Sequence, residues 1–217
     1  MAWLICGILI LVVRHFVRNS WISVSIIVAL VVFMCFITWF FRVPERETPP
    51  GDGLVTSACD GKVVIVEKVY EPEYMKEECI QISVYMDFFD VHANFWPASG
   101  EVSYYKYHPG KYLLAFLPKS SELNEHSSTG ITVPSGDRLF FKQIAGTFAR
   151  RIVCYSEPGL ETVRGEQCGV IKFGSRIDIF LPLDAEVKVK VGDKVRAVES
   201  VIAVLSGKRD GGQDLPQ

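Results

Sequence analysis

His92 is the histidine whose sequence surroundings best suit acid or base chemistry. It lies in an Asp-x-His-x-Asn set, Asp90 to Asn94, among large apolar residues that are expected to bury it: Phe88, Phe89, Val91, Phe95 and Trp96. A buried imidazole needs partners for both ring nitrogens, and its pKa can shift. The pattern makes His92 a candidate general acid or base, although a structural buried histidine fits it equally well.

The other histidines have surroundings that suggest less chemistry. His15 lies in an apolar N-terminal segment, His108 precedes Pro109-Gly110, and His126 lies in a polar stretch rich in Ser. Turn and loop residues of this kind are usually solvated. We therefore predict that His108 and His126 are solvated turn residues.

Asp60 and the Gly174-Ser175 pair are polar positions next to predicted strands. Asp60 directly precedes Gly61, and an Asp-Gly turn accounts for it without any chemistry. Gly174-Ser175 interrupts two apolar segments, and a Gly-Ser pair alone is common enough by chance to carry no weight. These positions become informative only through their wider surroundings.

The cysteine pattern gives no support to a metal site. Of the six cysteines, two lie in apolar segments and the other four form no Cys-x-x-Cys pair, so neither a zinc site nor a thioredoxin-like motif is predicted. Unpatterned cysteines favour reduced core residues and thus a cytoplasmic position. The sequence also lacks a P-loop and a dinucleotide-binding fingerprint.

A mainly β, antiparallel domain is predicted to position these residues. Period-two alternation and β-branched runs predict strands at 62–69, 79–86, 101–107, 138–144, 170–173, 176–181 and 185–191. Only 120–127 and 147–153 have helical character, and the tail from Ser206 is predicted to be disordered. The C-terminal part, 185–199, resembles the barrel-sandwich domains of biotinyl and lipoyl carriers, but it lacks their modifiable lysine at a hairpin tip.

An α-helical membrane anchor is predicted to precede this domain. Residues 21–41 carry no charge, and roughly 30 Å of helix covers the bilayer core. Residues 2–13 are apolar but short for a span, which suggests a hairpin or re-entrant segment. Arg14 and Arg18 on one side balance Arg42 and Arg46 on the other, so charge leaves the topology open.

Composition excludes two broad classes. The 217 residues include 23 Lys and Arg against 25 Asp and Glu, and 49% are hydrophobic. A disordered chain would be less hydrophobic, and a nucleic-acid-binding protein would show a basic surplus. We therefore expect a folded protein with no nucleic-acid partner. A Pro/Gly-rich connector suggests an anchor at 1–48 and a main domain at 49–217.

Six segments in one order resemble the short, compact bacterial and archaeal phosphatidylserine decarboxylase proenzymes. They are Phe41-Arg42-x-Pro44-x-Arg46, Asp90 to Asn94, Pro97 to Gly100, His108 to Lys111, Ala149 to Val153 and Gly169 to Pro182. The resemblance covers most of the chain from about residue 40 to 205. It includes a Phe-Gly-Ser cleavage site at Gly174-Ser175.

The resemblance implies a cofactor that the chain makes from itself. Ser175 would attack the Gly174 carbonyl, and the resulting ester would eliminate and hydrolyse to leave a pyruvoyl group at position 175. Residues 1–174 and 175–217 would then remain together as a heterodimer, and a homodimer of this unit is also compatible with the family. A Schiff base between the pyruvoyl group and phosphatidylserine would release carbon dioxide and yield phosphatidylethanolamine.

Further roles carry over only where the motifs match. By resemblance, Asp60 assists self-cleavage together with a histidine and Ser175, as in a protease triad, and His92 matches a family histidine. Longer members have a second histidine where this chain has Phe95, so either His92 serves both steps or cleavage uses another base. Relatives in this branch also tend to be more charged at Leu123 and His126.

Two alternatives from other classes stay open. A non-catalytic, membrane-anchored barrel-sandwich protein of the carrier or fusion type would share the anchor and would remain one polypeptide. A membrane-bound peptidase using Ser175, His92 and Asp60 would keep its serine. For the decarboxylase, the expected location is a bacterial inner membrane with the catalytic domain on the cytoplasmic face, because the lipid precursor is made there.

Overall fold

The computed structural model describes residues 2–111, 123–146, 152–171 and 175–207. The chain divides into two compact units, Met1–Arg42 and Val43–Gln217. The first unit is helical and the second is built from β-strands. The predicted mainly antiparallel β domain, preceded by an α-helical N-terminal segment, is confirmed.

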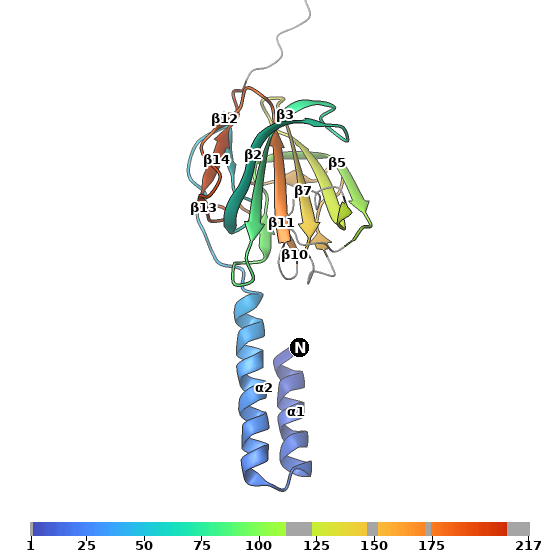
Figure 1. The fold of residues 1–217 in the computed structure, drawn as a ribbon, viewed down its shortest axis with the longest axis vertical. Helices are drawn as coiled ribbons and strands as arrows, with labels where there is room; N and C mark the ends of the chain where they lie inside the picture. The colour runs from blue at the N-terminus through green and yellow to red at the C-terminus, as the bar shows by residue number, and fades with distance from the viewer. Residues whose placement is uncertain (1, 112–122, 147–151, 172–174, 208–217) are drawn as a thin grey trace, which may run out of the picture. The chain divides into compact units, whose positions relative to one another are not determined.

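The helical unit is a hairpin of α1 (Ala2–Phe16) and α2 (Ser20–Phe40), which contact each other (Figure 1). Asn19 caps α2, because its Oδ1 accepts from the Trp21 amide at 3.1 Å. Among the described residues, α2 alone is long and apolar enough to cross a membrane, and α1 is shorter. Many large apolar side chains of this unit are exposed, including Trp21 at 85%.

The β unit contains an eight-stranded sheet in the order β13-β2-β3-β11-β7-β6-β5-β9 (Figure 1). Its strands are β2 (Gly61–Glu71), β3 (Glu77–Met86), β5 (Gly100–His108), β6 (His126–Thr132), β7 (Arg138–Ala145), β9 (Glu161–Thr162), β11 (Ser175–Leu181) and β13 (Lys194–Val195). Strand β11 is internal, with seven residue pairs to β3 and six to β7. Both edges of β11 are therefore hydrogen-bonded.

Two three-stranded sheets complete the unit. One has the order β1-β14-β12, with β1 (Leu54–Thr56), β14 (Val201–Val204) and β12 (Glu186–Val187). The other has the order β4-β10-β8, with β4 (Ala93–Phe95), β10 (Gln167–Ile171) and β8 (Ile152–Cys154). All pairs between these named strands are antiparallel.

The large sheet is buried on both faces at its centre, where every residue of β11 is buried. Alternate residues of β11, including Ile177 and Ile179, enter the main core with Phe141 of β7. The intervening Phe180 packs on the opposite face against Phe140 and the β2–β3 connection. The period of two thus sends Ser175 to the main-core face and Arg176 to the other.

Most predicted strands are confirmed within a few residues, but the two predicted helical segments are wrong where they run into strands, although Leu123 is helical as predicted. His126 and Ser127 belong to β6, and Ile152 and Val153 to β8. Strand β6 pairs with β5 and β7 on its two edges, and this tertiary pairing overrides local propensity. Residues 120–122 and 147–151 of these segments lie outside the described residues, as do 172–173 of the strand predicted at 170–173 and 208–217 of the predicted disordered tail.

Candidate active site

Ser175 opens β11 and is fully buried. Its Cα partners are Met86 at the end of β3 and Ala145 at the end of β7. The hydroxyl donates to Met86 Sδ at 3.5 Å, and a thioether sulfur is only a weak acceptor. The serine is thus fixed by backbone pairing, while its hydroxyl is held weakly.

The loop between β3 and β4 places His92 close to the Ser175 end of β11. The loop starts after Met86, the partner of Ser175, and ends at His92, whose carbonyl accepts from the Ile171 amide at 3.3 Å. Ile171 and Ser175 are also the described residues on either side of 172–174. Both ends of the His92 loop are therefore paired with the chain that flanks Gly174, which itself lies outside the described residues.

His92 is buried, at 1% exposure, as its apolar neighbours predict. Its Nδ1 lies 2.8 Å from the Asp90 carbonyl oxygen. Because a carbonyl can only accept, Nδ1 donates to it, and this hydrogen bond fixes the orientation of the ring. Burial raises the pKa of neighbouring Asp90, and the charges of Asp60 and Asp87 raise it further. A backbone hydrogen bond at Asp87 and the charge of His92 lower this pKa but do not outweigh burial.

A chain of buried amides and hydroxyls continues from Met86 into the sheet. Asn94 Nδ2 donates to Met86 Sδ at 3.7 Å, and Gln143 Nε2 donates to Asn94 Oδ1 at 2.8 Å. Ser127 Oγ in turn donates to Gln143 Oε1 at 2.9 Å. Met86 therefore contacts both Ser175 and this chain. No sequence signal marks Gln143 or Ser127, because the network joins positions far apart along the chain.

Asp60 lies at the same end of the sheet, on the other side of β3. It directly precedes Gly61, and a Cβ on Gly61 would lie 2.1 Å from the Tyr85 carbonyl oxygen. Tyr85 is also the Cα partner of Arg176, the residue after Ser175. Strand β3 is thus sandwiched between the Asp60 turn and the start of β11.

The Asp60 carboxylate is bound by Arg46 and by the Ala197 amide. Arg46 Nη2 donates to Asp60 Oδ2 at 2.8 Å, its Nη1 donates to Oδ1, and the Ala197 amide donates to Oδ1 at 2.8 Å. The structure thus gathers Ser175, His92 and Asp60 at one end of the sheet. The structure also pairs the Asp60 carboxylate with Arg46, which the sequence analysis identified only as part of the segment Phe41-Arg42-x-Pro44-x-Arg46.

The prediction that His108 and His126 are solvated turn residues is wrong. His108 ends β5 and His126 begins β6, directly opposite each other. Their rings stack with centroids 4.3 Å apart, and His126 is buried. Strand pairing brings them together, since local sequence could not show that each faces the other.

These histidines belong to a charged cluster on the face of the sheet opposite Ser175. His108 Nε2 lies 2.6 Å from Glu73 Oε1, and Lys142 Nζ lies 3.2 Å from Glu73 Oε2. Ligand atoms of Glu73, His108 and His126 lie within 4.8 Å of one another, a spacing that could hold a metal ion. Lys142 already compensates the Glu73 charge, so the cluster is satisfied by its own residues.

The charges of this cluster shift two pKa values. Burial lowers the pKa of His126, and the charges of His108 and Lys142 lower it further, against the hydrogen bond to the Asn124 carbonyl. Burial acts to raise the pKa of Glu73, but the hydrogen bond with His108 and the charge of Lys142 outweigh it, so this pKa is lowered. His126 is therefore held neutral beside an ionised Glu73.

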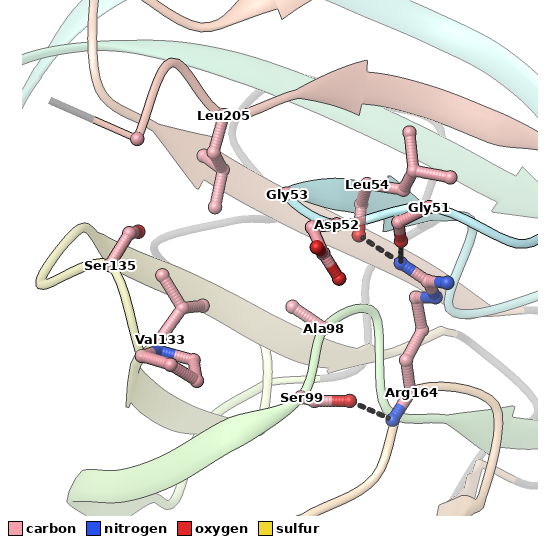
Figure 2. Close-up of a pocket in the computed structure, with 12 residues that line it drawn as sticks. Gly51, Asp52, Gly53, Leu54, Ala98, Ser99, Val133, Ser135, Arg164 and Leu205 are labelled. Carbon is pink, nitrogen blue, oxygen red and sulfur yellow. Dashed lines mark hydrogen bonds between the residues drawn. The ribbon is translucent and has the colours of Figure 1, made fainter.

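A cavity of about 420 Å³ lies at the other end of the unit (Figure 2). Its lining includes Val133 and Ser135 from the β6–β7 turn, whereas Ser175 pairs with the opposite end of β7. Figure 2 shows Arg164 at its edge, with Nη1 donating to the carbonyls of Gly51 and Leu54, each at 3.1 Å. This cavity is separate from the candidate active site.

Comparison with known proteins gives the family. A family model described as phosphatidylserine decarboxylase matches residues 33–203. The chain belongs to the phosphatidylserine decarboxylase family. The matched range includes Asp60, His92 and Ser175, and it extends from within α2 to β14.

Curated members of the phosphatidylserine decarboxylase family match most of this chain. A phosphatidylserine decarboxylase proenzyme of Amoebophilus asiaticus is 47% identical over 81% of this chain and 78% of its own length. Proenzymes of the same name from Syntrophus aciditrophicus and Porphyromonas gingivalis are 41% and 40% identical. They cover 92% and 94% of this chain, and the matches cover 92% and 93% of the relatives.

His126→Gln should flatten the pH dependence of stability between about pH 7.5 and 5.5. Because the folded pKa of His126 is lowered, the unfolded state takes up the proton first, and the free energy of unfolding falls as pH drops through the unfolded value of about 6.5. One group contributes at most roughly 1.4 kcal/mol per pH unit. Urea unfolding of the full chain in detergent measures this, with His15→Gln as the control. Equal slopes for wild type and His126→Gln would contradict it.

Proposed function

We propose that this protein is a phosphatidylserine decarboxylase that makes its own pyruvoyl group from Ser175 by autocatalytic cleavage after Gly174. The observation that carries the proposal is the setting of Ser175: buried, first in a doubly paired strand, and beside the loop that ends at His92. Further support comes from the family match and from relatives named phosphatidylserine decarboxylase proenzymes.

Self-cleavage would convert one peptide bond into two new chain ends. Ser175 Oγ adds to the Gly174 carbonyl carbon as a base takes the hydroxyl proton; the Gly174–Ser175 C–N bond then breaks, and the freed nitrogen takes a proton, which leaves an ester. Removal of the Ser175 α-proton expels the Gly174 carboxylate and leaves dehydroalanine. Water then replaces its nitrogen, which leaves as ammonia, and a pyruvoyl group begins residues 175–217.

The described residues fit a group at this position. Seven pairs to β3 and six to β7 would keep the new chain end in place after cleavage, so the two chains would remain a heterodimer. A pyruvoyl group at this position would supply the electron sink for decarboxylation of the serine head group of the lipid. The buried surroundings of Ser175 would keep bulk water from that site.

His92 is the residue that we assign to proton transfer. Its buried ring is oriented by the hydrogen bond from Nδ1 to the Asp90 carbonyl, and an imidazole can take up and return a proton near neutral pH. Phe95 stands where longer members have a second histidine, and its side chain packs in an apolar cluster with Val91 and Val198. We assign to Asp60 a supporting role in cleavage, through the end of β3 that it shares with Ser175.

The helical unit gives the lipid reaction its membrane location. Residues 1–48 would supply the anchor and the start of its connector, and residues 49–217 the decarboxylase domain. Support comes from α2, which is long and apolar enough to span a bilayer, and from the exposed apolar side chains of this unit. We place the domain on the cytoplasmic face of a bacterial inner membrane, in line with six free cysteines.

The two alternative functions are less well supported. A membrane-bound peptidase that uses Ser175, His92 and Asp60 does not account for the match to the phosphatidylserine decarboxylase family model. A non-catalytic barrel-sandwich protein does not account for the match to decarboxylase proenzymes along most of the chain.

Ser175→Ala should remain a full-length chain, whereas the wild type should yield fragments 1–174 and 175–217, the second with a blocked N-terminus. The reason is that alanine has no hydroxyl to attack the Gly174 carbonyl. Gel mobility and intact mass measure the outcome, with Ser200→Ala as a control outside the site. An unmodified Ser175 in a catalytically active preparation would refute the mechanism.

His92→Ala should lower carbon dioxide release from phosphatidylserine by roughly 100- to 10,000-fold, the usual contribution of a general acid or base. If His92 also serves cleavage, the same variant accumulates as precursor. Asp60→Asn should lower the rate of self-cleavage more than it lowers the rate of decarboxylation by the fraction of the enzyme that has been cleaved. Cleavage and carbon dioxide release are followed separately, with His108→Ala on the opposite face as control. Near wild-type rates in His92→Ala would show that the assignment is wrong.

Deleting residues 2–42 should leave a β unit that still cleaves itself, because Asp60, His92 and Ser175 all belong to Val43–Gln217. The truncated enzyme should act slowly on phosphatidylserine vesicles and recover in detergent mixed micelles, since anchoring raises the effective concentration of enzyme at the lipid surface. Carbon dioxide release in the two lipid forms measures the difference. A folded but uncleaved product would instead make the anchor part of the catalytic unit.

A further inference from the structure

We infer that Arg46 is a positioning residue that acts through Asp60 in self-cleavage. The inference rests on the proposed function and adds a residue to which that function assigns no role. Arg46 lies in the connector that follows the helical unit, six residues after the end of α2.

The contacts of Arg46 converge on one carboxylate. Its guanidinium binds both Asp60 oxygens, and Nη1 also donates to the Ala197 carbonyl at 3.0 Å. Ala197 closes the arrangement, because its amide donates to Asp60 Oδ1 at 2.8 Å. A planar guanidinium that binds two oxygens fixes the plane of the carboxylate, which a single hydrogen bond would not do.

This arrangement leaves capacity on one oxygen. Among the described residues, Oδ1 accepts from Arg46 and from Ala197, and Oδ2 accepts from Arg46 alone. Each carboxylate oxygen has two lone pairs. Asp60 Oδ2 therefore keeps one acceptor position for a proton donor in the cleavage step, and Arg46 determines which position that is.

Burial makes the pair sensitive to the loss of either partner. The side chain of Arg46 is 5% exposed and that of Asp60 is 14% exposed. The hydrogen bond to Asp60 raises the pKa of Arg46, although burial acts in the opposite direction, so the guanidinium stays charged. Within the part of the chain that the structure describes, removing Arg46 would leave a largely buried carboxylate with the Ala197 amide as its one donor.

The backbone transmits this positioning toward Ser175. Gly61, the residue after Asp60, lies so close to the Tyr85 carbonyl that a Cβ would not fit. On its other edge the same stretch of β3 pairs with Ser175 and Arg176. When Arg46 fixes the Asp60 carboxylate, it therefore also fixes the position of that carboxylate relative to β3, the strand that pairs with Ser175.

Arg164 provides a matched control, because it binds the same connector without contacting Asp60. Its guanidinium donates to the carbonyls of Pro49, Gly51 and Leu54, at 2.7, 3.1 and 3.1 Å. Substitution of Arg164 should loosen the connector as much as substitution of Arg46, while it leaves the carboxylate in place. The two arginines thus separate positioning of Asp60 from general stability.

The experiment measures the first-order rate at which full-length precursor converts into its two fragments, and the melting temperature of each variant. The set is wild type, Arg46→Gln, Arg46→Lys, Asp60→Asn, the Arg46→Gln/Asp60→Asn double variant, Arg164→Gln and Arg164→Lys. We expect Arg46→Gln to cleave roughly 10- to 100-fold more slowly, by analogy with the loss of residues that orient metal ligands. Arg46→Lys should recover part of this loss, the double variant should be no slower than Asp60→Asn, and Arg164→Gln should cleave within threefold of wild type.

Three results would overturn the role of Arg46 while leaving the proposed function intact. The first is a wild-type cleavage rate in Arg46→Gln, and the second is an equal loss of rate in Arg46→Gln and Arg164→Gln. The third is a double variant whose loss of rate is the product of the losses in the two single variants. If Arg46→Gln does not fold, the Arg46→Lys variant is compared with Arg164→Lys. Cleavage that is fivefold slower in Arg46→Lys than in Arg164→Lys, at equal melting temperature, supports the role of Arg46, and equal rates overturn it. If wild type itself does not cleave, the proposed function fails first.

Discussion

The antiparallel pairing of β11 with β3 and β7 is the constraint on which the rest of the site depends. It buries Ser175 at the first position of an internal strand and fixes its backbone from both edges. The same register places Met86 next to Ser175, so the loop that follows Met86 must pass close to the start of β11. His92 ends that loop, and its carbonyl bonds Ile171 on the far side of Gly174. Backbone hydrogen bonds therefore place Ser175 and His92 at the same end of the sheet.

The two faces of the large sheet carry different chemistry. On the face of Ser175 the polar atoms are neutral and linked by hydrogen bonds, from Met86 through Asn94 to Gln143. On the opposite face, Glu73, Lys142 and two stacked histidines form a charged network. A strand alternates its side chains between faces, so adjacent residues contribute to networks that do not mix. This separation places the Glu73 and Lys142 charges on the face of the sheet opposite Ser175.

The connector between the two units is fixed by two arginines. Arg46 reaches from the connector to Asp60, and Arg164 reaches from the β unit back to connector carbonyls. A Pro/Gly-rich segment with little secondary structure would otherwise order poorly. Here its backbone carbonyls are satisfied by a guanidinium, and its own arginine completes the surroundings of a candidate catalytic carboxylate. The segment that begins the β unit is thus also part of the candidate site.

The sequence by itself determined the features that depend on local pattern. Alternating apolar residues predicted the strands at 62–69, 79–86 and 176–181, an uncharged run predicted α2, and the apolar neighbours of His92 predicted its burial. Only the tertiary structure decided which residues meet. The stacking of His108 on His126, the bond of Gln143 to Asn94 and the pairing of Arg46 with Asp60 all join positions that no local period relates. The helical predictions failed at 126–127 and 152–153 for the same reason: pairing with strands distant in sequence outweighs the weak propensity of a short segment.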